Sequence, residues 1–223
     1  MSRKFKIFLY GLTCVNLIFV SIIAIKLLNR YYKREWIVIH ADMMESISPS
    51  KVYFIGDSQM DNLCGLKQDA KKIRCITAPG ISILQLKELL EKGNRKVSPS
   101  KVFILLGIND LRSGSTVEHA LKSYESMLQT CQKKFPQSTC YLISLLPIIE
   151  SVPINNGLKN ASIVKFNHGV KGFAQTKGIY YLPIYELISR GDSLPMEYTF
   201  DGLHLNSLGN TLLYQAIYGF ANF

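Results

Sequence analysis

The sequence predicts an α/β domain in which a parallel sheet is covered by helices on both faces. Five short apolar runs alternate with helix-like stretches after residue 50, an order typical of parallel sheets. The runs are continuously apolar instead of alternating, as expected for strands that are buried on both faces. Glycine and polar residues follow the first three runs, and in parallel sheets binding sites form outside the carboxyl ends of strands.

The composition divides the chain of 223 residues into three parts. Residues 1–28 are apolar with basic ends, residues 29–50 form a polar connector with aromatic side chains, and residues 51–223 have the length of one domain. We find no internal repeat and no low-complexity tract.

The N-terminal part has the pattern of a membrane anchor. Residues 7–25 carry no charge and are bounded by lysines, and a helix needs about 20 such residues to cross a bilayer. A cleaved signal peptide is the rival interpretation, but its apolar region would be about 7–15 residues, followed by small residues. We therefore predict a single-pass signal anchor. Basic residues on both sides leave its orientation open.

The charge distribution argues against a nucleic-acid-binding domain. Seven of the 26 basic residues lie within residues 1–34, which contain no acid, so 19 bases face 16 acids in the rest of the chain. A nucleic-acid footprint would require a basic face on the domain itself.

The cysteines outside the anchor fall into two local pairs, Cys64 with Cys75 and Cys131 with Cys140. Two disulfides in an oxidising compartment would explain this pattern. Four free thiols in a reducing compartment remain the alternative. We favour a domain on the extracytoplasmic side. No Cys-x-x-Cys or His/Cys cluster indicates a metal site.

The expected elements follow in chain order. The predicted strands are residues 52–55, 73–78, 102–106, 139–145 and 179–184. The predicted helices are residues 82–92, 117–134, 161–177 and 207–220. The helical assignment is clearest in the second, where apolar Val117, Leu121, Tyr124 and Leu128 recur at spacings of three and four.

Ser58 is the candidate nucleophile, in Gly56-Asp57-Ser58 after the first strand. A serine hydroxyl needs an adjacent base to attack a carbonyl. Gly56 would let the chain turn off the strand, and a helix beginning at Ser58 would aim N–H groups at an oxyanion. An ordinary helix N-cap serine is the alternative.

Asp201 and His204 form the candidate acid–base pair, in Asp-Gly-Leu-His. Imidazole is the side chain that titrates near neutral pH, and Asp201 could turn back to orient the ring. A surface turn is the alternative. His40, His119 and His168 lack this context, and we interpret them as ordinary residues.

Gly80 and Asn109 are candidate oxyanion donors, because each lies just beyond a predicted strand. Gly80 would donate its backbone N–H group and Asn109 its side-chain amide. A simple turn and an Asx-turn are the respective alternatives.

These segments resemble the SGNH/GDSL hydrolase family. The resemblance rests on residues 54–58, 78–82, 105–111 and 201–209, and spans roughly residues 51–221. Within the family, the chain is similar to the branch of platelet-activating-factor acetylhydrolase subunits and lysophospholipase-L1-like esterases. Gln59 departs from the leucine that the family name implies, which bears on substrate preference. The Gly-x-Ser-x-Gly elbow of α/β-hydrolases is absent around Ser58.

The resemblance implies a flavodoxin-like three-layer α/β/α sandwich with a five-stranded parallel sheet, and a serine esterase without cofactor. It implies Ser58 as nucleophile, His204 as base and Asp201 as orienting acid. It also implies an oxyanion hole made by the Ser58 N–H group, the Gly80 N–H group and the Asn109 side chain.

The expected function is a membrane-anchored ester hydrolase that removes acetyl or short acyl groups from a glycan or lipid. Two alternatives remain: an acyltransferase that passes the acyl group to a sugar hydroxyl, and a membrane-tethered binding protein without catalysis. Apolar residues after the fourth strand either line an acyl pocket or cap the core; they are Ile148, Ile149, Val152 and Ile154. The sequon Asn160-Ala161-Ser162 matters if the host glycosylates exported proteins.

Overall fold

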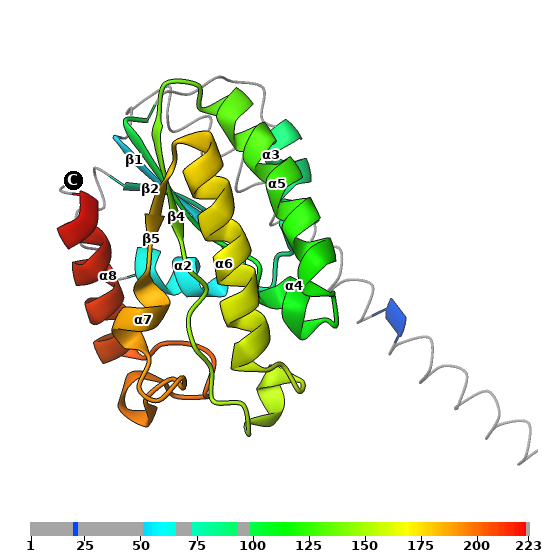
Figure 1. The fold of residues 1–223 in the computed structure, drawn as a ribbon, viewed down its shortest axis with the longest axis vertical. Coiled ribbons are helices and arrows are strands. Elements are labelled where there is room, and N and C mark those ends of the chain that lie inside the picture. The colour runs from blue at the N-terminus through cyan, green and yellow to red at the C-terminus, as the bar shows by residue number, and fades with distance from the viewer. Residues whose placement is uncertain (1–19, 22–50, 66–72, 93–98, 222–223) are drawn as a thin grey trace, which may run out of the picture. The chain divides into compact units, whose positions relative to one another are not determined.

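The computed structural model of the chain describes residues 20–21, 51–65, 73–92 and 99–221. All the elements described below belong to the unit Val38–Phe223. They form a five-stranded parallel sheet between two layers of helices, the predicted three-layer arrangement (Figure 1).

The sheet has the strand order β2-β1-β3-β4-β5. Its strands are β1 (Val52–Gly56), β2 (Ile73–Thr77), β3 (Lys101–Leu105), β4 (Thr139–Ile143) and β5 (Tyr180–Leu182). The chain moves outward from β1 to β2 and then returns to β3 on the other side of β1. Ligand sites of open parallel sheets form at the carboxyl ends of strands where the order reverses in this way, here between β1 and β3.

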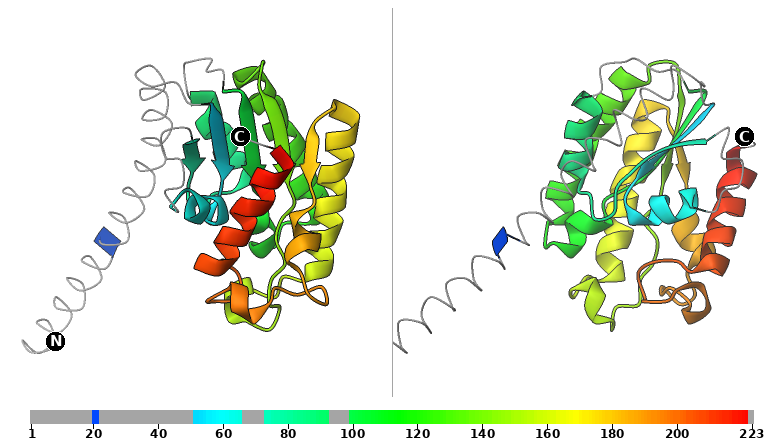
Figure 2. Two further views of the ribbon diagram at one scale, coloured as in Figure 1. Left: turned by 90° about the vertical axis from the view of Figure 1, so that its left-hand side faces the viewer. Right: turned by 180° about the vertical axis from the view of Figure 1, so that it is seen from behind.

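Helices cover both faces of the sheet. The α-helices are α2 (Ser58–Cys64), α3 (Ile83–Lys92), α4 (Ile108–Arg112), α5 (Val117–Lys134), α6 (Asn160–Lys177), α7 (Ile184–Ile188) and α8 (Ser207–Ala221). Two short 3-10 helices are η1 (Pro153–Asn155) and η2 (Met196–Tyr198). Helices α3, α5 and α6 pack side by side on one face, whereas α8 packs against α2 and α7 on the other (Figures 1 and 2).

An aromatic row crosses four strands at one register. Phe54, Phe103, Tyr141 and Tyr180 are successive pairing partners on β1, β3, β4 and β5. Phe103 stacks on Tyr141 with ring centroids 4.6 Å apart, and Phe54 meets Phe103 edge to face at 5.4 Å. Such pairs add to the hydrophobic stabilisation from burial and fix the strand register.

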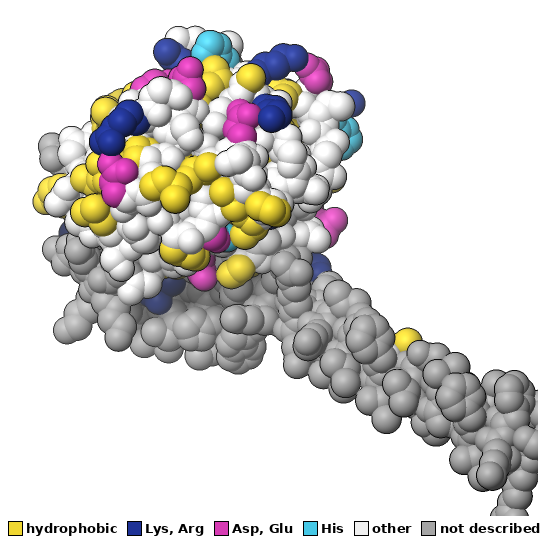
Figure 3. Space-filling view, turned by 90° about the horizontal axis from the view of Figure 1, so that it is seen from below, with side chains coloured by type: hydrophobic (Ala, Val, Ile, Leu, Met, Phe, Trp, Pro, Cys, Tyr) yellow, Lys and Arg dark blue, Asp and Glu magenta, His cyan; other side chains and the backbone are white. Residues whose placement is uncertain are grey.

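The carboxyl ends of the strands point to the lower edge of the sheet in Figure 1. Figure 3 looks onto this end and shows hydrophobic side chains interspersed with charged and polar ones. The loops that follow the strands therefore present a chemically mixed face.

The predicted strands and long helices are confirmed, and no observed end differs from its predicted end by more than two residues. Strand β4 ends at Ile143 and β5 at Leu182, before the predicted ends. The sequence did not indicate α4 and α7 as helices. Each has five residues, which is too short to display helical periodicity.

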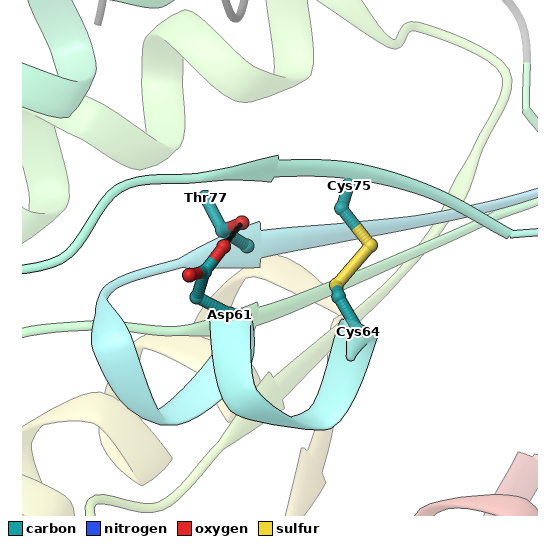
Figure 4. Close-up of a disulfide and its surroundings, with 4 residues drawn as sticks. All are labelled: Asp61, Cys64, Cys75 and Thr77. Carbon is teal, nitrogen blue, oxygen red and sulfur yellow. Dashed lines mark hydrogen bonds between the residues drawn. A yellow bond between two sulfur atoms is a disulfide. The ribbon is translucent and has the colours of Figure 1, made fainter. Parts of the chain in front are cut away.

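One of the two cysteine pairs is bonded. Cys64 at the end of α2 and Cys75 in β2 form a disulfide, beside a hydrogen bond of 2.6 Å that Thr77 donates to Asp61 (Figure 4). The possible Cys131–Cys140 disulfide is not formed, because both thiols are free. The Cys131 sulfur lies 3.4 Å from the sulfur of Met127.

The predicted anchor and connector lie outside the described residues, apart from Val20 and Ser21. Among the residues that the structure describes, no helix combines the length and the apolar character needed to cross a bilayer.

Candidate active site

Ser58 begins α2, two residues after the last residue of β1. Asp57 caps this helix, because its Oδ1 atom accepts from the Gln59 N–H group at 3.0 Å. Gly56 brings β1 close to β3: a Cβ atom there would lie 2.1 Å from the Leu105 carbonyl oxygen. The sequence alone did not indicate this need for glycine. Together these residues set the serine at the switch point of the sheet.

Ser58, His204 and Asp201 form a continuous hydrogen-bonded relay. The Ser58 Oγ atom lies 3.0 Å from His204 Nε2, and His204 Nδ1 lies 2.7 Å from Asp201 Oδ2. With Nδ1–H donating to the carboxylate, Nε2 becomes the acceptor for the serine hydroxyl. The structure therefore joins residues that are 146 positions apart in the chain, in the order that the sequence predicted.

The turn that carries the pair is held by Asp201 itself. Its Oδ1 atom accepts from the N–H groups of Leu203 and His204, at 3.0 and 2.7 Å. Partial burial opposes ionisation, but hydrogen bonds from the His204 ring and these N–H groups hold the pKa of Asp201 below its ordinary value. The lowered pKa favours the charged carboxylate.

Thr199 closes the same turn and was not recognised from the sequence. Its hydroxyl donates to the His204 carbonyl at 2.7 Å and accepts from the Gly202 N–H group at 2.9 Å. Threonine two positions before an aspartate is too common a pattern to reveal this role.

Asn109, the second residue of α4, has its amide fixed from both sides. Its Oδ1 atom accepts from Arg112 Nη1 at 3.3 Å, and its Nδ2 atom donates to the Ile81 carbonyl at 3.1 Å. These partners determine which way the amide faces. Because an amide nitrogen carries two hydrogens, the second can serve another acceptor. Arg112 was missed, although its spacing of three from Asn109 on one helix was a usable signal.

Gly80 lies on the segment that Asn109 contacts. It follows β2 by three residues and has a φ of +70°, in the left-handed region that favours glycine. Its neighbour Ile81 binds the Asn109 amide. The structure thus places the predicted oxyanion residues on adjacent segments at the ends of β2 and β3.

Asp57 and Gln59 are buried on either side of Ser58. Burial raises the pKa of Asp57 to about 7, against the hydrogen bond from the Gln59 N–H group. The Gln59 side chain donates to the Leu203 carbonyl at 3.1 Å, within the Asp201–His204 turn. Gln59, where the family name implies leucine, therefore links α2, the helix that begins at Ser58, to the acid–base turn, which is the turn of Asp201–His204.

Phe200 stacks on the His204 ring, with centroids 6.0 Å apart and an interplanar angle of 10°. It is 69% exposed, which is unusual for a large aromatic residue next to a relay of this kind. No sequence pattern pointed to this residue.

The remaining candidates that the structure describes form no hydrogen bond within the relay. His119 and His168 are exposed, as expected for ordinary residues, and His40 is outside the described residues. Ile148 is fully buried and Val152 packs against Gly202, so both support the core-capping interpretation. Within the described ranges, no group of His, Cys, Asp or Glu is arranged to hold a metal ion.

The sequon asparagine is not accessible. Asn160 is 6% exposed, and its amide both accepts from and donates to the backbone of Ile148, at 2.9 Å each. The amide nitrogen, to which a glycan would be attached, is therefore buried and already donates a hydrogen bond.

A family model described as GDSL-like Lipase/Acylhydrolase matches residues 69–212. The match contains Gly80, Asn109, Asp201 and His204, and begins after Ser58. A comparison with curated proteins finds no match.

Several solved structures share the fold. A Streptococcus pneumonia protein provisionally described as a platelet activating factor is 25% identical with a TM-score of 0.76, over 89% of this chain and 98% of its own. A GDSL-like lipase from Bacteroides thetaiotaomicron is 21% identical with a TM-score of 0.63, over 75% and 87% of the two chains. An acetyl-xylooligosaccharide esterase variant from Geobacillus Stearmophilus is 18% identical with a TM-score of 0.58, over 79% and 95%.

Proposed function

Because the chain belongs to the GDSL-like lipase/acylhydrolase family and is an ester hydrolase, we propose that it works through an acyl-enzyme on Ser58. The observation that carries the proposal is the relay from Ser58 through His204 to Asp201, with links of 3.0 and 2.7 Å. A relay of this order and length is the arrangement that activates a serine hydroxyl.

In the first half-reaction, Ser58 Oγ attacks the ester carbonyl while His204 Nε2 takes the hydroxyl proton. The carbonyl oxygen becomes an oxyanion, which the Ser58 and Gly80 N–H groups and the Asn109 amide are proposed to stabilise. His204 then gives its proton to the leaving alcohol as the bond between carbonyl carbon and alcohol oxygen breaks. The acyl group remains on Ser58.

In the second half-reaction, water replaces the alcohol. His204 takes a proton from the water as it attacks the acyl carbon, and returns that proton to Ser58 Oγ as the ester bond to serine breaks. Asp201 keeps its charge throughout and stabilises the imidazolium that forms twice in each cycle.

We further propose that the substrate carries an acetyl or short acyl group on a glycan or lipid. Acetyl-xylooligosaccharide esterase activity in one structural neighbour supports this class. We also propose that residues 1–28 anchor the enzyme with its catalytic domain on the extracytoplasmic side. The Cys64–Cys75 disulfide supports this location, because disulfides persist in oxidising compartments.

The function is tested with the full chain, purified in detergent micelles, on nitrophenyl esters from acetyl to long acyl. Ser58→Ala should lower kcat/KM by about 10³-fold or more. Ser126→Ala, the same substitution on α5, should retain the activity of the unmodified chain. Turnover that survives Ser58→Ala would refute the acyl-enzyme.

The location is tested by fractionating cells that make the full chain. The enzyme should stay in the membrane fraction after an alkaline carbonate wash and be cut by protease added outside intact cells. Release by the wash, or protection from the protease, would contradict the anchor or its orientation.

A further inference from the structure

An open pocket of about 550 Å³ lies beside the relay, between α2 and the segment that leads from the acid–base turn into α8. Its lining includes Asp61, Asn62, Phe200, Asn206 and Asn210. We propose that this pocket binds the leaving alcohol of the ester, and that this alcohol is a carbohydrate. The inference rests on the function proposed above and narrows its substrate class.

The position of the pocket follows from its two walls. On α2, Ser58 is followed by Asp61 and Asn62 at spacings of three and four, so these residues share a helix face with the nucleophile. The other wall includes Phe200 and Leu205, on either side of His204 in the chain. Phe200, which stacks on the His204 ring, therefore places the pocket next to the relay.

The direction of proton transfer assigns this pocket to the alcohol. His204 must deliver its proton to the leaving oxygen, so the alcohol has to lie beside the imidazole ring. Phe200 stacks on that ring and lines the pocket. The proposed oxyanion donors Gly80 and Asn109 do not line this pocket, so different residues would hold the carbonyl oxygen and the alcohol.

The lining suits a neutral ring that carries hydroxyl groups. An exposed aromatic face accepts the C–H groups of a sugar ring, whose partial positive charge matches the negative face of the aromatic ring. Asp61 Oδ1 already accepts from Thr77, but a carboxylate has about four acceptor sites. Figure 4 shows the second carboxylate oxygen of Asp61 pointing away from Thr77. Sugar hydroxyl groups can donate to it.

The charge of the lining disfavours a phospholipid. None of the described residues that line the pocket is basic, and Asp61 is acidic. A phosphate group would therefore enter against a negative charge without a compensating cation.

The pocket lining also includes the amide of Asn210, which is 6% exposed. Its Oδ1 atom is buried and has no hydrogen-bond partner among the described residues.

The test compares esters that share the acetyl group and differ in the alcohol. The full chain is assayed by acetate release from ethyl acetate, from acetylated xylooligosaccharides and from micelles of an acetylated ether phosphatidylcholine. Ethyl acetate is too small to reach the pocket wall. Phe200→Ala should lower the ratio of kcat/KM for the oligosaccharide to that for ethyl acetate by about tenfold, mainly through KM. Phe200→Tyr, which keeps the aromatic face, should restore the ratio.

Phe220→Ala is the matched control, because Phe220 is also exposed but lies near the opposite end of α8. It should leave the ratio unchanged. An unchanged ratio in Phe200→Ala would overturn the proposal, and so would a selective loss of phospholipid hydrolysis. Ethyl acetate hydrolysis that survives in Ser58→Ala would instead refute the acyl-enzyme, so the two failures are distinguishable.

Discussion

At the scale of single residues, Gln59 joins the two halves of the active site. Its backbone is held by the Asp57 cap, and its side chain holds the Leu203 carbonyl inside the acid–base turn. The relay spans two segments that are distant in the sequence, so a direct bond between them helps to set the distance from Ser58 to His204. Gln59 acts through these residues and is a positioning residue.

We expect Gln59→Leu to lower kcat about tenfold with little change in KM, because it removes the bond that aligns the two segments. The free energy of unfolding should change by less than about 1 kcal/mol, since the variant also removes a buried amide oxygen without a partner. Steady-state kinetics and urea unfolding measure the two effects. Gln132→Leu on the exposed face of α5 is the control, and an unchanged kcat would contradict this role.

Asp57 should make stability depend on pH. Its pKa is raised from 3.8 to about 7 by burial, so the folded state holds the proton more tightly than the unfolded state does. Between these two values, rising pH therefore removes stability, on the order of a few kcal/mol. Above a pH of about 7, the pKa of Asp57 in the folded state, no further stability is lost.

Asp57→Asn keeps a capping oxygen and cannot ionise. We expect the unfolding free energy of this variant, relative to the unmodified chain, to rise from pH 4 to pH 7 and then to level off. Urea unfolding across this range measures the difference. A difference that is constant with pH would show that Asp57 does not titrate as described.

At the scale of elements, α6 supports the segment after β4 through two buried asparagines, Asn160 and Asn167, which lie about two turns apart on the same face of the helix. Asn167 pairs with both backbone groups of Leu145, at 2.8 and 3.0 Å, as Asn160 does with Ile148. This segment in turn carries Ile149, whose N–H group donates to the Gly202 carbonyl in the acid–base turn. Helix α6 thus supports the turn indirectly.

Asn167→Ala should lower the free energy of unfolding by about 3 kcal/mol, because it leaves a buried N–H group and a buried carbonyl unpaired. Thermal and urea unfolding would measure the loss. Lys171→Ala on the exposed side of α6 should cost less than about 0.5 kcal/mol. If Asn167→Ala and Lys171→Ala lowered the free energy of unfolding equally, the supporting role of Asn167 would be contradicted.

The Cys64–Cys75 disulfide links α2, the helix that begins at Ser58, to β2. It closes a sequence separation of 11 residues, for which the chain-entropy model gives about 3 kcal/mol. Replacing both cysteines with serine should lower the free energy of unfolding by about that amount. Reductant should destabilise the unmodified chain equally and leave the double variant unchanged. An effect of reductant on the double variant would point to another cause.

Which elements were predictable depends on their length. Helices α5 and α6 have 18 residues each, and their boundaries follow from the sequence to within one residue. The short α4 and α7 were missed, because five residues cannot display a period of 3.6. The bonded cysteine pair could not be distinguished from the free one, since both pairs have similar local spacing.

At the scale of the whole molecule, the sheet order creates the site. Strands β1 and β3 are neighbours, and the segments after β1, β2 and β3 carry Ser58, Gly80 and Asn109. The sequence predicts that these segments share one edge, because all the strands are parallel. It does not predict which strands are neighbours, since local patterns contain no information on pairing partners.

The three residues of the hydrogen-bonded relay could be proposed from short motifs, whereas the residues that support them could not. Ser58, Asp201 and His204 stand in recognisable motifs. Thr199 and Phe200 act through contacts that only the folded chain creates. A single sequence gives no signal for such contacts.

The central claim is that Ser58 carries the acyl group during turnover. The most direct measurement mixes the full chain with nitrophenyl acetate, quenches in acid within the first turnover and maps the acetyl group by peptide mass spectrometry. The account predicts one acetyl group per chain, on the peptide that contains Ser58, and none in Ser58→Ala or His204→Ala. Rapid hydrolysis with no acetylated Ser58, or acetylation of another residue that turns over at the rate of catalysis, would contradict it.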